Sequence, residues 1–219
     1  AGAYSCVDGV SYAPHGFPNV DMLGSDIYLF SAYKTYGPHQ GIMVVRRELG
    51  MSLPNQGHYF NSDSLYKRFT PAGPDHAQVA ACAGMADYVD VVYAHHFKAE
   101  ATPAVRCAQV HDLFRAHEVH LTQPILDYLE AKNSAQLIGP ANAEDRAPTI
   151  AVKLQMPGEE AAEKLVPFGV MAGGGDFYAV RPLEAMNIAP EHGVLRLSFV
   201  HYTGPKDVDR LLNALDHIL

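Results

Sequence analysis

Apolar positions in the first fifty residues come in short, nearly uninterrupted runs. These runs cover residues 3–7, 27–30 and 41–45. They are too short for helices and show little polar alternation, a pattern typical of strands buried on both faces of an α/β sheet. The first part of the chain is therefore expected to contribute consecutive strands to such a sheet.

The next stretch, residues 47–73, breaks this pattern. It is rich in Asn, Ser, Tyr, Pro and Gly, with several aromatic side chains among the polar ones. Aromatic residues are unusual in a flexible linker, so we expect a long loop with a functional role.

Helical signals dominate the middle of the chain. Asp75 is a suitable N-cap for a buried, alanine-rich helix over residues 77–92. Thr102 followed by Pro103 predicts the start of a longer helix, because proline is favoured at the first helical position. Pro124 should kink that helix or split it in two. The apolar stripe of the longer helix consists of Val110, Leu113, Phe114, Leu121, Ile125 and Leu129.

The remainder predicts a small α/β unit. Strands are expected over residues 149–154 and 194–202, with a short helix over 159–165 between them and a glycine loop after it. Pro205 begins a last helix with an apolar stripe at helical spacing. The change of pattern between Tyr93 and Pro103 predicts two domains, residues 1–95 and 96–219.

Composition excludes several classes of protein. The 219 residues carry a net charge of −8, which argues against nucleic acid as a main partner. No apolar run reaches the roughly 18 residues of a membrane span, so no membrane partner is expected. The three cysteines have no CxxC spacing and cannot all pair, which favours a cytoplasmic, reducing compartment.

Two residues at strand ends suggest cofactor chemistry. Asp8 and Lys34 each follow a predicted strand, and ligands of open α/β sheets bind at the carboxyl ends of strands. Pyridoxal phosphate needs a lysine to hold it and a carboxylate beside its pyridine nitrogen. Taken singly, each residue has an ordinary explanation, since Asp-Gly forms turns and a lone lysine is usually solvated.

The surrounding sequence resembles the class V aminotransferases, and most of all their cysteine desulfurase group. The resemblance rests first on Val7-Asp8-Gly9 and on the S-x-x-K-x-Y-G-P segment from Ser31 to Pro38. It continues through Arg68–Pro74, which is similar to a loop that reaches the partner subunit's site. It ends at Leu195–Phe199, which is similar to an R-x-S-F strand of the family.

The resemblance implies a fold and an assembly. The chain would form the C-terminal part of the large domain of a pyridoxal phosphate-dependent transferase, with a mixed or parallel sheet and helices, followed by a small C-terminal α/β domain. Only seven residues precede Asp8, so the sequence is expected to be the C-terminal part of a longer enzyme. That enzyme is expected to be a homodimer acting on an amino acid.

The resemblance also assigns roles to residues. Lys34 would be the Schiff-base lysine and proton carrier, and Asp8 would pair with the pyridine nitrogen. Ser31 and Tyr33 would lie at the phosphate, and Ser11 would lie near the phenolic oxygen of the cofactor. Tyr33 replaces the histidine that desulfurases usually carry, and Ser11 replaces their glutamine.

The resemblance also bears on substrate recognition and on a thiol that this sequence lacks. Arg196 would hold the substrate carboxylate, which suits the planar guanidinium fork. The segment over residues 171–179 matches the place where desulfurases keep a nucleophilic cysteine, and it has none. Cys6, Cys82 and Cys107 are each expected to be buried, small hydrophobic residues.

Three functions stay open from sequence. The first is a pyridoxal phosphate enzyme of class V aminotransferase type, acting on an amino acid through Lys34. The second is a cysteine desulfurase or selenocysteine lyase with a non-standard thiol. The third is a non-catalytic, dimerising remnant of the fold. A metal site is not expected, because His117 and His120 have helical spacing but no third ligand nearby. His39, in the turn close to Lys34, is a candidate for the rim of the cofactor site.

Overall fold

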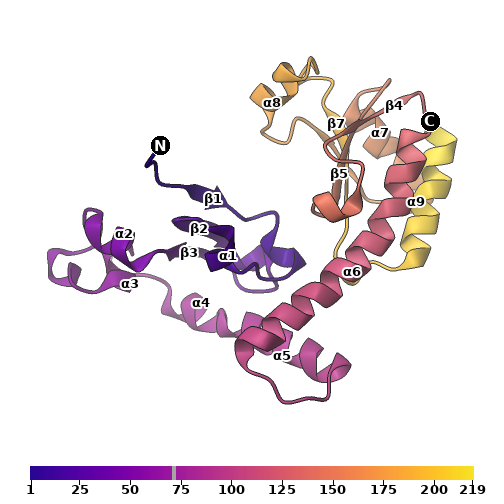
Figure 1. The fold of residues 1–219 in the computed structure, drawn as a ribbon. Helices are drawn as coiled ribbons and strands as arrows, with labels where there is room; N and C mark the ends of the chain where they lie inside the picture. The colour runs from indigo at the N-terminus through magenta and orange to yellow at the C-terminus, as the bar shows by residue number, and fades with distance from the viewer. Residues whose placement is uncertain (71–72) are drawn as a thin grey trace. The chain divides into compact units, whose positions relative to one another are not determined.

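The computed structural model describes residues 1–70 and 73–219, which form two compact units over residues 1–112 and 113–219 (Figure 1). Each unit has its own sheet, and the long helix α6 (Pro103–Glu130) passes through the division between them. The sequence-based division after residue 95 concerns the domains of the enzyme as a whole and stays a prediction.

The sheet of the first unit has three strands in the order β1 (Cys6–Asp8), β2 (Ile27–Ser31) and β3 (Gly41–Val45). β1 and β2 are parallel, with Asp8 opposite Leu29, and β2 and β3 are antiparallel. The sheet is therefore mixed, and the carboxyl ends of β1 and β2 lie at the same edge.

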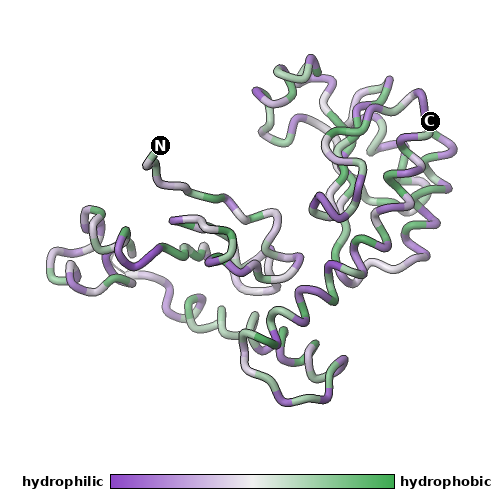
Figure 2. The backbone as a smooth tube through the Cα atoms, viewed as in Figure 1, coloured by the Kyte–Doolittle hydropathy of each residue, from purple (hydrophilic) through white to green (hydrophobic). Residues whose placement is uncertain are grey.

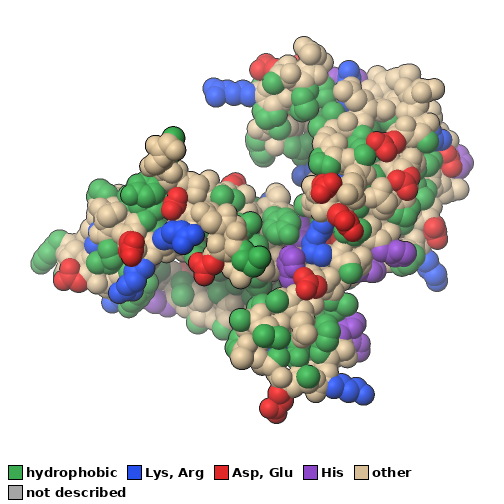
Figure 3. Space-filling model, viewed as in Figure 1, with side chains coloured by type: hydrophobic (Ala, Val, Ile, Leu, Met, Phe, Trp, Pro, Cys, Tyr) green, Lys and Arg blue, Asp and Glu red, His purple; other side chains and the backbone are tan. Residues whose placement is uncertain are grey.

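These strands are less buried than their pattern predicted. All of β1 is exposed, and in β3 Met43 and Val44 are each 41% exposed, whereas Tyr28 in β2 is only 4% exposed. Figure 3 shows hydrophobic side chains among charged ones on the visible face of this unit. The expectation of burial on both faces is wrong for the described chain, because neighbouring elements cover only part of the sheet.

The stretch over residues 47–73 contains helical segments, which corrects the prediction of a continuous loop. It forms α2 (Arg47–Ser52), a 3₁₀ turn at Tyr59–Asn61 and α3 (Leu65–Arg68). The buried Arg68 guanidinium holds the stretch together, because it donates to the carbonyl oxygens of Leu53 and Ser62. Such long-range donation by one arginine leaves no local pattern in the sequence.

Other short helices complete the first unit. They are α1 (Val20–Leu23), α4 (His76–Ala81), α5 (Ala83–His96) and two 3₁₀ turns at Ala13–His15 and Ala32–Lys34.

The predicted helix over residues 77–92 forms as two helices. The Asp75 cap is confirmed, because its Oδ1 accepts from the backbone N–H groups of Ala77 and Gln78 at 3.0 and 3.1 Å. The helix is interrupted at Cys82, which lies between α4 and α5. The expected burial is wrong for most of residues 77–92, since alanines favour helix without needing burial. The buried residues of this stretch are Met85 and Val89.

The long helix α6 begins at Pro103 as predicted, with Thr102 Oγ1 3.4 Å from the Val105 N–H. Pro124 lies inside α6 and does not split it, so of the two expected effects the split is wrong and the kink stays a prediction. On both sides of Pro124, Leu121 and Ile125 are at most 2% exposed. Their burial in the core offsets the backbone hydrogen bond that proline removes.

The second unit is a small α/β structure, as predicted. Its antiparallel sheet has the order β4-β5-β7-β6. The strands are β4 (Ala135–Ile138), β5 (Thr149–Leu154), β6 (Gly173–Gly175) and β7 (Val194–Ser198). The helices are α7 (Gly158–Leu165), α8 (Val180–Ala185) and α9 (Pro205–Ile218), with 3₁₀ turns at Ala143–Asp145 and Val166–Phe168. Sequence analysis missed β4, read β6 as loop, and extended β7 four residues too far.

One face of this sheet packs on helices. Ile150 and Val152 of β5 and Leu195 of β7 are fully buried in one core, which also takes apolar residues from α6, α7 and α9. Figure 2 shows α9 alternating between hydrophobic and hydrophilic residues along its length, as expected for a helix with one buried face. The fold is thus α/β in both units, and the predicted fold class is confirmed.

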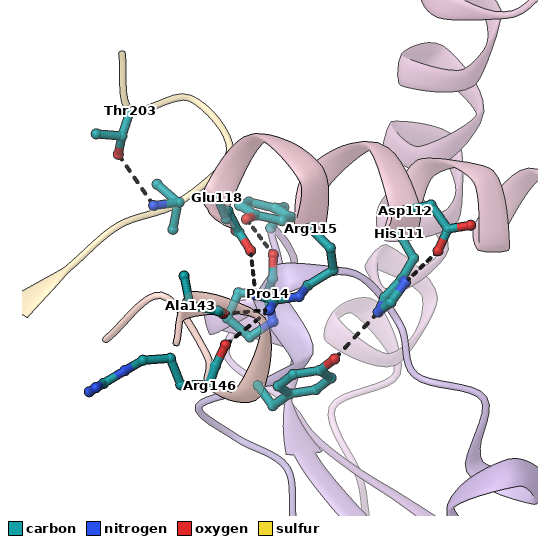
Figure 4. A network of polar contacts seen from close by, with 11 residues as sticks. Pro14, His111, Asp112, Arg115, Glu118, Ala143, Arg146 and Thr203 are labelled. Atoms are coloured by element: carbon teal, nitrogen blue, oxygen red, sulfur yellow. Dashed lines mark hydrogen bonds and ion pairs between the residues drawn. The ribbon is translucent and has the colours of Figure 1, made fainter. Parts of the chain in front are cut away.

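A polar network ties α6 to a loop of the second unit (Figure 4). Arg115 Nη2 donates to the carbonyl oxygens of Ala143 and Arg146 at 3.3 and 3.0 Å, and its Nη1 lies 3.5 Å from the buried Glu118 carboxylate. One guanidinium thus satisfies two carbonyl oxygens of the loop, which holds the loop in place. The Arg115 guanidinium therefore has a structural task at this loop.

Gly174, the middle glycine of β6, allows the strand backbone to approach α7. A Cβ on Gly174 would lie 2.1 Å from the carbonyl oxygen of Gly158 and 2.3 Å from the backbone nitrogen of Glu159. Gly174→Ala is therefore expected to destabilise the protein by about 2 kcal/mol or more, because two backbones must separate. Urea unfolding of the whole protein measures this change.

Gly84→Ala is the matched control for this substitution. Gly84 lies in α5, and no atom approaches within 4 Å of its Cβ position. Alanine there should be neutral or stabilise by up to about 1 kcal/mol through helix propensity. Equal effects of the two substitutions would contradict the close approach of β6 to α7.

Candidate active site

Asp8 ends β1 at the edge where β1 and β2 both finish. Its Oδ1 accepts from the Val10 N–H at 2.9 Å, and the Gly9 N–H continues the ladder by donating to the Leu29 carbonyl oxygen at 2.7 Å. The carboxylate is exposed, yet it stands on a backbone fixed on both sides. It can therefore present one oxygen to a ligand without losing its local support.

Lys34 lies at the end of the 3₁₀ turn that follows β2. The turn is closed by backbone hydrogen bonds, from Ala32 N–H to the Gln40 carbonyl oxygen and from Gly37 N–H to the Ala32 carbonyl oxygen, both at 2.8 Å. The Lys34 side chain is exposed, and among the described residues its ammonium has neither an ion-pair partner nor a hydrogen-bond partner. A free amine thus stands on a rigid turn at the Asp8 edge of the sheet.

Packing below the turn adds to its rigidity. A Cβ on Gly37 would lie 2.8 Å from the Met85 side chain of α5, so only glycine permits this close approach. Tyr36 has a φ of 64°, and its hydroxyl donates to the Pro14 carbonyl oxygen at 2.7 Å. A bulky residue with positive φ is uncommon and is held here by that bond.

Ser31, the last residue of β2, carries a hydroxyl that suits an anion. Its Oγ is buried and has no hydrogen-bond partner among the described residues. A buried hydroxyl without a partner costs free energy, and this cost falls when a ligand oxygen accepts its proton. A phosphate oxygen is such an acceptor.

Sequence analysis missed Tyr28, whose ring lies beside the Asp8 strand end. A Cβ on Gly9 would fall 2.0 Å from the Tyr28 hydroxyl oxygen, so the phenol occupies the space that Gly9 leaves open. Burial raises the pKa of Tyr28, and the nearby Tyr12 and Asp8 raise it further. Its hydroxyl has no partner among the described residues. The only sequence signal was the glycine after Asp8, which any turn would also explain.

Tyr33 and His39 form a pair beside Lys34. Their rings stack with centroids 4.9 Å apart and planes 7° from parallel. His39 therefore places an imidazole next to Tyr33, the position at which desulfurases usually carry a histidine, from the far side of the turn. Ser11, by contrast, is exposed in the turn after β1, and among residues 1–70 and 73–219 its side chain has no hydrogen-bond partner.

These residues fit pyridoxal phosphate by their chemistry. The first unit offers a free amine, a carboxylate fixed at a strand end and an unpartnered buried hydroxyl. These groups match the aldehyde, the pyridine nitrogen and the phosphate of that cofactor.

Arg196 lies in the second unit, on the sheet face opposite the core that contains Ile150, Val152 and Leu195. Its neighbours across the sheet are Gly173 on β6 and Ala151 on β5, both small. The guanidinium lies over the Phe177 ring, 4.4 Å from its centroid. Sequence analysis had singled out Arg196 but not its aromatic neighbour.

The segment that would hold a nucleophilic cysteine contains β6 and then Asp176, Phe177 and Tyr178. The cysteines elsewhere are not the buried residues that we expected, because Cys6 is exposed and Cys82 and Cys107 are half-buried. Desolvation raises the pKa of Cys107, which disfavours its thiolate.

Three further sequence-based expectations concern a loop towards a partner subunit, a metal site and a membrane span. The segment Arg68–Pro74 includes Pro71 and Ala72, which lie outside the described residues, so its role towards a partner stays a prediction. No group of three His, Cys, Asp or Glu side chains able to hold a metal ion occurs among residues 1–70 and 73–219. Within the same described ranges, no helix is long and apolar enough to cross a bilayer.

The chain is similar to several known proteins along nearly its whole length. The chain is 29% identical to an aminotransferase-like protein of Gibberella zeae, covering 100% of the chain and 52% of that protein. It is 25% identical to a cysteine desulfurase-like protein of Aspergillus flavus (100% of the chain, 48% of the relative) and to a probable cysteine desulfurase of Streptomyces coelicolor (99% and 50%).

Solved structures show the same fold. The crystal structure of a cysteine desulfurase from Escherichia coli matches with a TM-score of 0.73 at 21% identity, over 99% of this chain and 51% of that one. The apo structure of a cysteine desulfurase from Thermococcus onnurineus matches with a TM-score of 0.74 at 20% identity, over 99% and 52%.

The chain thus spans about half the length of the curated relatives that it matches. The family model for class V aminotransferases matches residues 1–211, nearly the whole chain. With the lysine turn and the carboxylate at one sheet edge, this match shows that the chain belongs to the class V aminotransferase family.

Proposed function

We propose that the whole protein is a pyridoxal phosphate-dependent enzyme that acts on the amino group of an amino acid, with Lys34 as its cofactor lysine. The observation that carries the proposal is the parallel pairing of β1 with β2. This pairing brings the Asp8 carboxylate and the rigid Lys34 turn to one edge of one sheet.

Each residue of the first unit has a distinct task in this proposal. Bound pyridoxal phosphate supplies an electron sink for the electrons of a broken bond at the substrate's α-carbon. Lys34 would hold the cofactor covalently, and its amine would move protons to and from the substrate. Asp8 keeps a proton on the pyridine nitrogen, because its charge favours the protonated ring.

The remaining residues bind and orient the cofactor or the substrate. Ser31 donates its buried hydroxyl to the phosphate, and Tyr33 contributes a second hydroxyl there. Ser11 donates at the phenolic oxygen of the cofactor. His39 stacks on Tyr33 and limits the movement of that ring. Arg196 binds the substrate carboxylate through its planar fork of donors.

We also propose that the whole enzyme is a homodimer with a cytoplasmic location. The resemblance of Arg68–Pro74 to a loop that reaches the partner's site supports the first part, and the cysteine content supports the second.

Cysteine desulfurization is the second candidate, favoured by the names of the similar proteins. The chain's own residues weigh against it, because the segment around Asp176 lacks a cysteine and persulfide formation needs a thiolate there. Amino-group transfer or another reaction at the α-carbon needs no such thiol.

One assay separates these candidates. The whole protein, loaded with pyridoxal phosphate, is incubated with each of the twenty L-amino acids, and 2-oxo acid, sulfide and loss of chirality are measured. We expect a reaction at the α-carbon of at least one amino acid and no sulfide from cysteine above the rate with free pyridoxal phosphate.

A triple variant with Cys6, Cys82 and Cys107 replaced by serine is the control. Its activity should equal that of the unmodified protein, because none of these thiols has a task in the proposal. Sulfide release that disappears in this variant would instead establish desulfurization by a non-standard thiol. Complete inactivity with every amino acid would favour a non-catalytic remnant of the fold.

A further inference from the structure

The Arg196 guanidinium is oriented by an aromatic ring and by nothing else that the structure describes. It lies over the Phe177 ring at 4.4 Å from the centroid. Within residues 1–70 and 73–219 it has neither a hydrogen-bond partner nor a carboxylate partner. A ring beneath the guanidinium attracts its charge and leaves the N–H donors at its edge free.

The neighbours of Arg196 in the sheet make room for this stack. Gly173 pairs with Arg196 across β6 and β7, so the two residues share one face of the sheet. A Cβ on Gly173 would lie 3.1 Å from two atoms of the Phe177 ring and 3.7 Å from Arg196 Nη2. The ring and the guanidinium therefore occupy the space where a larger residue would place its side chain.

Phe177 has an unfavourable backbone conformation where it stacks on Arg196. Phe177 and Tyr178 have φ values of 51° and 62°, in the left-handed region that bulky residues rarely adopt. Asp176 supports the turn, because its Oδ1 accepts from the Tyr178 N–H at 3.0 Å. The Phe177 ring also packs against a small apolar cluster formed by Leu183, Ile188 and Val194.

We propose that Phe177 is a positioning residue that holds the Arg196 guanidinium in place to receive the substrate carboxylate. This inference rests on the proposed function, because it takes Arg196 as the carboxylate-binding residue. Phe177 itself need not touch the substrate. It restricts an otherwise mobile arginine to one plane, so that less conformational entropy is lost when a carboxylate binds in that plane.

The test compares amino-acid binding with binding of a carboxylate-free amine. The probe is the L-amino acid that changes the absorbance of the loaded cofactor at the lowest concentration, titrated beside the amine with the same side chain. Phe177→Leu keeps apolar packing on the Leu183 cluster but removes the ring. It should weaken amino-acid binding by about 3- to 30-fold and leave amine binding unchanged.

Two further variants separate positioning from packing. Phe177→Tyr keeps a ring beneath the guanidinium and should restore amino-acid binding to within about twofold of the unmodified protein. Gly173→Ala pushes on the same ring and should weaken amino-acid binding in the direction of Phe177→Leu. The thermal midpoint of each variant, measured alongside, shows whether a loss follows unfolding.

Failure of the inference and failure of the proposed function give different results. Arg196→Gln should abolish the preference for the amino acid over the amine. If it does so while Phe177→Leu binds like the unmodified protein, the positioning role is overturned and the proposed function stands. If Arg196→Gln has no effect, or no amino acid changes the absorbance, the carboxylate site falls and the role of Phe177 falls with it.

Discussion

The whole protein with Lys34 replaced by alanine should lose turnover almost completely while keeping part of its affinity for pyridoxal phosphate. The loss is expected to reach at least about 1,000-fold, because the variant lacks both the covalent attachment point and the proton carrier. Part of the affinity should persist, because Asp8 and Ser31 are unchanged and contact other parts of the cofactor in the proposal. Turnover and cofactor absorbance measure the two effects separately.

Chemical labelling tests the same residue directly. Borohydride reduction of the loaded protein should fix the cofactor on the peptide that contains Lys34, as measured by mass spectrometry. The structure supports this choice among the lysines, because Lys34 stands on a turn closed by backbone hydrogen bonds at the Asp8 edge of the sheet.

Two other lysines serve as controls. Lys67 lies in α3 and Lys153 in β5, and replacing either with alanine should leave labelling and turnover unchanged. A reduced adduct on Lys67 or Lys153, or full activity in Lys34→Ala, would refute the assignment of Lys34.

Asp8→Asn should lower both cofactor affinity and turnover, the latter by about 100-fold or more. Asparagine keeps a side-chain oxygen that can accept from the Val10 N–H, so the strand end should stay in place. It removes the negative charge that favours a protonated pyridine nitrogen. Equilibrium titration with pyridoxal phosphate and initial rates report the two losses.

An aspartate with no task in the proposed site provides the comparison for Asp8. Asp87 is exposed on α5, and Asp87→Asn changes the net charge by the same amount. It should leave affinity and rate unchanged, which separates a local effect of the Asp8 carboxylate from a general effect of charge. An Asp8→Asn protein as active as Asp87→Asn would show that the carboxylate does not act on the cofactor.

Both predictions depend on features that local sequence encodes. The short apolar runs ending at Asp8 and before Lys34 predicted strands, and the structure forms them at β1 and β2. Helix starts at Asp75 and Thr102 were also readable, because capping depends on a few adjacent residues. The segment around Lys34 indicated the class V aminotransferase family, and the model of that family matches nearly the whole chain.

Burial was predicted less well than secondary structure. The apolar strands of the first unit were expected to be buried on both faces, yet all of β1 is exposed. The alanine-rich helices and Cys6 were likewise expected inside and lie largely outside. Hydrophobicity and helix propensity are properties of a segment, whereas burial depends on what other segments cover it.

The sequence by itself determined the family and the order of most elements, because both depend on short, contiguous patterns. The residues proposed to meet a cofactor stay predictions. The tertiary structure alone decided which distant side chains meet. It placed His39 on Tyr33, Tyr28 in the space left by Gly9, and Phe177 beneath Arg196. Such contacts arise from strand register, tight turns and positive φ angles, and no local pattern of residues records them.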